Sequence, residues 1–95
     1  MVLITYDVNT QTPEGRRRLR LVAKICVDYG QRVQNSVFEC LVDQVQFATL
    51  RRQLEMVIDK EHDSLRYYFL GKNWKNRVEH VGAKHTYDPE GLLMV

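Results

Sequence analysis

Alternating and helical spacings of apolar residues divide the chain into strands and two helices. Residues 2–8 are mainly β-branched and aromatic and are interrupted by Asp7 near their end, which is typical of a buried central strand. Thr12 can cap a following helix that has Pro13 at its first position, and Gly30 is predicted to stop it. The core face of this helix has the i, i+3, i+4, i+7 spacing and comprises Leu19, Val22, Ala23 and Cys26.

The middle of the chain predicts further strands around a second helix. Residues 32–42 are rich in β-forming side chains, but the polar residues 34–36 leave open whether they form one long strand or two short ones. Asp43 and Gln46 match a capping box, and the helix that follows is predicted to end near Lys60. Its apolar face comprises Phe47, Leu50, Leu54, Val57 and Ile58.

The last third of the chain predicts strands at residues 64–70 and 77–81. Residues 91–95 form an apolar segment that, left exposed, would be an unpaired edge, so we expect it to pair with a sheet of this subunit or of a second one. We therefore predict one domain over residues 1–95, an α+β ferredoxin-like sandwich with a mainly antiparallel sheet and two helices on one face. This architecture hosts many functions and settles none of them.

Size and composition add constraints on assembly and location. A domain of 95 residues buries only a little over ~60% of its unfolded surface, which favours association with another chain. Cys26 and Cys40 have neither a CxxC pattern nor a secretory segment nearby, so we expect both to be reduced and buried. No apolar run approaches the ~18 residues that cross a bilayer. The sequence thus favours a soluble, cytoplasmic protein that does not bind membranes.

Candidate chemistry lies in the first third of the chain. The net charge is only +2, yet five of the fourteen Lys and Arg residues fall within residues 16–24. They are Arg16, Arg17, Arg18, Arg20 and Lys24, of which Arg17, Arg20 and Lys24 share one helical stripe. Guanidinium groups can hold phosphate oxygens through forked hydrogen bonds, and Asp7 at a strand end is a hard ligand for a cation. The simpler alternatives are a solvated helix face and an Asp that caps a loop.

Three segments together carry a family resemblance: Leu3–Val8, Arg16–Arg20 and Arg32–Glu39, followed by the strand-like residues Val78–Gly82. In these residues the chain resembles the CRISPR-associated protein 2 family, the small subunit of the machinery that acquires spacers, and it is most similar to members from type I-C systems. The resemblance covers the whole length of the chain.

The resemblance implies a homodimeric ferredoxin-like protein in which Asp7 faces its mate across the twofold axis. Some members are metal-dependent endonucleases on RNA or DNA, and others bridge integrase dimers. The family's functional Tyr and Asp fall on Tyr6 and Asp7, its helix arginines on Arg18 and Arg20, and its second-strand Arg and Phe on Arg32 and Phe38.

These observations together predict a CRISPR-associated endonuclease for antiviral defence. Paired Asp7 carboxylates would bind Mg²⁺ or Mn²⁺, and the arginines would position the phosphate, with duplex DNA favoured over RNA as substrate. Tyr6 points to the face opposite Asp7, where a core role is as plausible as a catalytic one, and Phe38 fits packing better than base stacking. The alternative is a non-catalytic adaptor that binds DNA and an integrase subunit; an RNA-binding module ranks last because both sheet faces would be covered.

Overall fold

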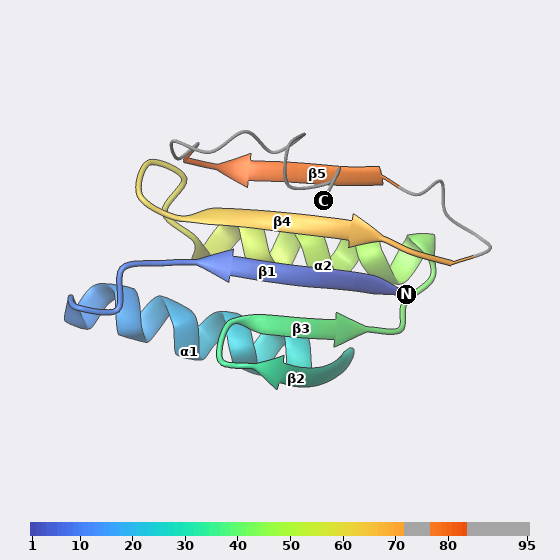
Figure 1. The fold of residues 1–95 in the computed structure, drawn as a ribbon, viewed down its shortest axis with the longest axis horizontal. Helices are drawn as coiled ribbons and strands as arrows, with labels where there is room; N and C mark the ends of the chain where they lie inside the picture. Colours follow the sequence, from blue (N-terminus) through green and yellow to red (C-terminus); the bar gives the residue numbers. More distant parts are fainter. Residues whose placement is uncertain (72–76, 84–95) are drawn as a thin grey trace.

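A five-stranded sheet forms the centre of the computed structural model, which describes residues 1–71 and 77–83 (Figure 1). The strand order is β2-β3-β1-β4-β5, and every neighbouring pair is antiparallel. This is the ferredoxin-like arrangement that the sequence predicts, with a fifth strand beside β4. The strands are β1 (Val2–Asp7), β2 (Gly30–Gln34), β3 (Val37–Cys40), β4 (Ser64–Phe69) and β5 (Arg77–Gly82).

Two helices, α1 (Pro13–Val27) and α2 (Gln44–Val57), lie side by side on one face of this sheet (Figure 1). Both begin at the caps expected from the sequence. The Thr12 hydroxyl accepts a hydrogen bond from the Gly15 amide at 3.0 Å, and Pro13 occupies the first turn, where its missing N–H costs nothing. At the start of α2, Asp43 and Gln46 form the reciprocal bonds of a capping box, at 2.7 and 3.0 Å.

Alternation along the central strands decides which side chains enter the core. In β1, Val2, Ile4 and Tyr6 are buried against the helices, whereas Asp7 is exposed on the opposite face. The predicted separation of Tyr6 from Asp7 is thus confirmed. In β4 the apolar residues Leu65, Tyr67 and Phe69 complete the same core. We call the side of the sheet away from α1 and α2 the open face.

Residues 30–40 form two strands, which answers the question that the sequence leaves open. A turn at residues 35–36 joins β2 to β3, and the pairing shifts register between Arg32 and Gln34. The predicted stop at Gly30 is wrong: α1 ends at Val27, and Gly30 already pairs in β2. A Cβ there would lie 1.8 Å from the carbonyl oxygen of Glu39, so close strand pairing explains this glycine.

Other predicted boundaries change by a few residues, and both thiols are where we expected them. Helix α2 ends at Val57, before the predicted Lys60, because Ile58 is extended and places its side chain in the core. Cys26 and Cys40 are free and buried. The predicted strand at residues 91–95 lies outside the described residues. Neither α1 nor α2, the helices in the part of the chain that the structure describes, is long and apolar enough for a membrane crossing.

Candidate functional site

Asp7 is the last residue of β1 and lies directly opposite Ser64, the first residue of β4. Ser64 in turn pairs with Gly82 at the end of β5. Three strands therefore meet at this end of the sheet, and the Asp7 side chain is exposed there on the open face. The Asp7 carboxylate is therefore at the protein surface, on a strand that pairs with β3 on one side and with β4 on the other.

Immediately behind Asp7, the buried carboxylate of Asp63 gathers four donors. Asp63 is 0% exposed and belongs to the loop between α2 and β4. Its Oδ2 accepts from the Tyr6 hydroxyl, from Arg18 Nε at 2.8 Å and from the Asp59 amide at 3.1 Å, and its Oδ1 accepts from Arg18 Nη2 at 3.1 Å. We call Tyr6, Arg18 and Asp63 the buried triad.

The charges within the buried triad fix the role of each member. Burial, together with the hydrogen bond to Asp63, raises the pKa of Tyr6 well above its ordinary value, so its phenol is a donor at neutral pH and not a base. The hydrogen bond to Asp63 raises the pKa of Arg18. Asp63 thus forms a forked, charge-assisted pair with Arg18 and has its lone pairs directed inward. It cannot serve as a metal ligand without losing these bonds.

The arginines grouped by the sequence do not share one environment. Arg18 turns inward from α1 to Asp63, and its side chain is 20% exposed. Arg17, Arg20 and Lys24 are exposed, as the predicted stripe requires. Arg16 is also exposed, and its Nη1 donates to the Thr10 carbonyl at 3.0 Å. The helix therefore offers phosphate several cations at its surface, while Arg18 is engaged by the protein itself.

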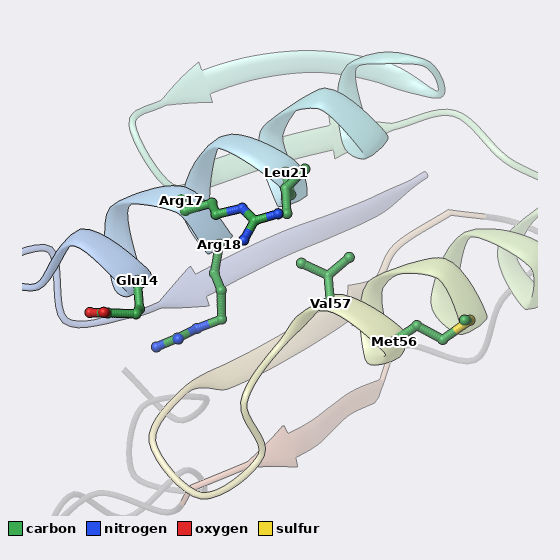
Figure 2. Close-up of a pocket in the computed structure, with 6 residues that line it drawn as sticks. All are labelled: Glu14, Arg17, Arg18, Leu21, Met56 and Val57. Atoms are coloured by element: carbon green, nitrogen blue, oxygen red, sulfur yellow. The ribbon is translucent and has the colours of Figure 1, made fainter.

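A shallow groove runs between α1 and the end of α2, and Arg17 and Arg18 line it together with Leu21, Met56 and Val57. Figure 2 shows the two arginines leaving α1 in different directions, with Arg18 extending toward the loop that follows α2. The different directions of the two side chains explain why Arg18 reaches Asp63 whereas Arg17 stays exposed.

Arg32 and Phe38 lie apart from Asp7, on the edge hairpin of the sheet. Arg32 donates to the carbonyl and side-chain oxygens of Asn35, at 2.7 and 3.2 Å, and its guanidinium lies 5.7 Å from the centre of the Phe38 ring. Phe38 is 0% exposed, which confirms its predicted packing role and leaves no ring face for a base. Strand β3 separates β2 from β1, so Arg32 does not join the site at Asp7.

One group of metal-binding side chain types occurs among the described residues, on the loop before β4. Ligand atoms of Asp59, Glu61 and His62 lie within 4.8 Å of one another. Asp59 accepts from His62 Nδ1 at 2.8 Å and from the Glu61 amide at 3.0 Å, and the His62 contact is the main reason that the pKa of Asp59 is lowered. These bonds are those of a closed polar turn and account for the grouping without an ion.

Of the predicted site residues, the structure brings together Tyr6, Asp7 and Arg18. It adds Asp63, which the sequence analysis does not single out. The signal available for Asp63 was its place directly before the alternating segment at residues 64–70. The position of Asp63 beside Asp7 depends on the pairing of β1 with β4, which local sequence patterns do not reveal.

Comparisons with known proteins agree with this architecture. A family model described as CRISPR associated protein Cas2 matches residues 1–78. The chain is 61% identical over 95 residues to a CRISPR-associated endoribonuclease Cas2 of Nitratidesulfovibrio vulgaris, covering 100% of this chain and 93% of the relative. It is 57% identical over 94 residues to a CRISPR-associated endonuclease Cas2 of Halalkalibacterium halodurans, covering 99% and 98% of the two chains.

A solved structure gives the same result. The crystal structure of Streptococcus pyogenes Cas2 at pH 6.5 superposes with a TM-score of 0.73 at 64% sequence identity, and the match covers 77% of this chain and 88% of that one. The predicted type I-C subtype stays a prediction. Matches of this identity and coverage, by sequence and by fold, show that the chain belongs to the CRISPR-associated Cas2 family.

Proposed function

We propose that this protein is a metal-dependent endonuclease that hydrolyses phosphodiester bonds in nucleic acid and takes part in CRISPR defence. Family membership and the nuclease names of its relatives support a nuclease role in CRISPR. The sequence favours duplex DNA, whereas the name of the Nitratidesulfovibrio relative points to RNA for that protein. The substrate is therefore decided by the assay below.

The observation that carries the proposal is the exposed Asp7 carboxylate at the end of a strand fixed from behind. Mg²⁺ or Mn²⁺ fits this donor, because such ions bind one or two carboxylates and keep several waters. Asp63 does not fit, because its oxygens already accept four hydrogen bonds. A bound ion would lower the pKa of a water and offset charge on the phosphate.

The proposal includes a homodimer because it assigns only one metal ligand, Asp7, to each chain. On the open face, Leu3, Thr5, Val37 and Glu39 are half-buried in the lone chain and form a strip of mixed polarity that continues from Asp7 across β1 and β3. A second copy packed on this strip would cover it and bring two Asp7 side chains toward one twofold axis. The exposed cations of α1, Arg16, Arg17, Arg20 and Lys24, would then position the nucleic acid backbone without reading bases.

The test is cleavage by the purified protein of single-stranded RNA, single-stranded DNA and duplex DNA, with Mg²⁺ or Mn²⁺ and with EDTA. We expect Asp7→Ala to lower the cleavage rate at least ~100-fold, the size typical of a lost transition-state interaction, and EDTA to do the same. The control is Asp28→Asn, an exposed acid at the C-cap of α1, which should cleave like the wild type. Asp7→Ala cleaving at the Asp28→Asn rate would refute the proposal, and cleavage of RNA alone would replace duplex DNA as substrate.

A second function, a non-catalytic adaptor between integrase subunits, is favoured by one observation. Asp63, the acid directly behind Asp7, is bonded to Arg18 and Tyr6, so Asp63 is not available as the second carboxylate that a self-contained two-metal nuclease uses. An adaptor would use the exposed cations of α1 and need no metal. Spacer acquisition in cells carrying Asp7→Ala separates the two functions, because an adaptor would remain competent and a required nuclease would not.

A further inference from the structure

Asp63 is a fully buried acid for which nucleic acid hydrolysis gives no direct use. A buried carboxylate is costly to desolvate, and a set of apolar side chains of similar volume often gives equal or greater stability. The chain nevertheless places Asp63 at 0% exposure and supplies it with Arg18 and Tyr6, from two other elements. The free-energy cost of burying this charge indicates that Asp63 holds other groups in position.

Asp63 is connected to Asp7 through two neighbouring residues. The first connection passes through Tyr6, which precedes Asp7 in β1 and whose hydroxyl donates a hydrogen bond to Asp63. The second passes through Ser64, which follows Asp63 in the chain and is the direct partner of Asp7 in the sheet. The Asp63 carbonyl also accepts the Ala83 amide at 2.8 Å, which ties the end of β5 to the same point.

We propose that Asp63 is a positioning residue: held by Arg18, it fixes Tyr6, which precedes Asp7, and Ser64, which pairs with Asp7, and so sets the direction of the exposed carboxylate toward a divalent cation. This inference deepens the proposed function and rests on it. Arg18 thereby has a different task from its neighbours, because its guanidinium balances the charge of Asp63 rather than that of a phosphate. Such indirect partners of a metal ligand typically change metal affinity by ~10–100-fold when removed.

Two variants and one matched control test this role. Asp63→Asn keeps the shape of the side chain but removes the charge that pairs with Arg18. Tyr6→Phe removes one hydroxyl and leaves the ion pair in place, so it stays informative if Asp63→Asn fails to fold. The control is Val2→Ala, a buried truncation at the other end of β1, about 16 Å from Asp7 along the strand.

The first readout needs neither substrate nor metal. Carboxyl-detected NMR of Asp7, assigned with the Asp7→Ala variant, reports the surroundings of its Cγ. We expect the Asp7 signal to shift or split in Asp63→Asn and in Tyr6→Phe and to keep its wild-type position in Val2→Ala. An unchanged Asp7 signal in both triad variants, in spectra that show folded protein, would overturn the inference.

The second readout separates positioning from general loss of stability. In Mn²⁺ titrations followed by paramagnetic broadening of the Asp7 signal and by cleavage, we expect the midpoint to rise ~10-fold in Asp63→Asn and less in Tyr6→Phe. The substrate KM at saturating metal should stay unchanged. A merely structural role would lower the active fraction at a constant Mn²⁺ midpoint, as expected for Val2→Ala, and that result would also overturn the inference.

If the proposed nuclease function is wrong, the NMR and Mn²⁺ readouts show a different pattern. If wild-type protein neither cleaves nor shows Mn²⁺ broadening at Asp7, the nuclease proposal fails whatever the variants do. The NMR comparison without metal then still decides whether Asp63 positions Asp7. If the wild type binds Mn²⁺ and cleaves while Asp63→Asn matches it in both readouts, the positioning role alone is refuted.

Discussion

Breaking the ion pair between Arg18 and Asp63 should cost more stability than a typical surface pair, and a double-mutant cycle can measure it. The variants are Arg18→Ala, Asp63→Ala and the double variant. Arg18→Ala leaves a wholly buried carboxylate with two of its four donors, the Tyr6 hydroxyl and the Asp59 amide. Asp63→Ala leaves the Tyr6 hydroxyl buried without its acceptor and Arg18 without its counterion.

The magnitude follows from the burial of the two partners. Removing one member of a buried pair costs about 3–5 kcal/mol, and exposed pairs are worth only about 0–1 kcal/mol. Because the Arg18 side chain is 20% exposed and that of Asp63 is 0% exposed, we take the lower end, about 3 kcal/mol for each single variant. The double variant removes both charges at once, so it should cost about 4 kcal/mol, which gives a coupling energy near 2 kcal/mol.

Urea unfolding at fixed protein concentration measures all four corners of the cycle. Constant concentration matters because association would add to the apparent stability. A domain of 95 residues has about 5–14 kcal/mol in total, so each variant should stay folded in water. With an m-value of about 1.5 kcal/mol/M, a loss of 3 kcal/mol lowers the midpoint by about 2 M. A coupling energy below about 0.5 kcal/mol would show that the pair behaves like a surface pair and would refute the reasoning.

Three further predictions follow from the same geometry. On duplex DNA, Arg17→Ala should reduce the slope of log affinity against log salt by ~0.9, whereas Arg18→Ala should leave it unchanged; an equal effect of both would place Arg18 on phosphate. Because the pKa of Tyr6 is raised in the folded protein, the unfolded chain loses this proton first above pH ~10, and urea midpoints should show stability falling with pH there. Tyr6→Phe should reduce that fall by up to about 1.4 kcal/mol per pH unit, and an identical pH dependence would contradict the assignment. Gly82→Ala should lower the free energy of unfolding by more than about 1 kcal/mol, because Gly82 has φ +104° and an added Cβ would lie 2.2 Å from the Asp63 carbonyl oxygen. A melting temperature equal to that of the wild type would refute this prediction.

The parts of the fold that local patterns specify were predictable from the sequence. Thr12 and the Asp43–Gln46 pair mark helix starts because a cap depends on residues three positions apart. The alternation in β1 placed Tyr6 inside and Asp7 outside because the period of a strand is two. The open choice at residues 34–36 was a real limit, since the same β-forming residues suit one strand or two until the pairing of β2 with β3 is known.

The buried triad was not predictable, because its members are far apart in sequence. Arg18 and Asp63 are 45 positions apart, and their contact depends on α1 crossing beside the β1–β4 pair. One signal for Arg18 was present in the helical period. It falls outside the exposed stripe of Arg17, Arg20 and Lys24 and lies one turn before Val22, at the border of the core face.

An internally neutral ion pair suits the place behind an exposed acid. If Asp63 were buried without Arg18, its negative charge would be unbalanced close to the Asp7 carboxylate, and the two like charges would repel each other. If the pair were replaced by apolar groups, the strand end would lose the hydrogen bonds that hold Tyr6 and the Asp59 amide. The ion pair of Arg18 with Asp63 supplies directional bonds and adds no net charge, so the affinity of this strand end for a cation is left to Asp7 and to the angle at which it is held.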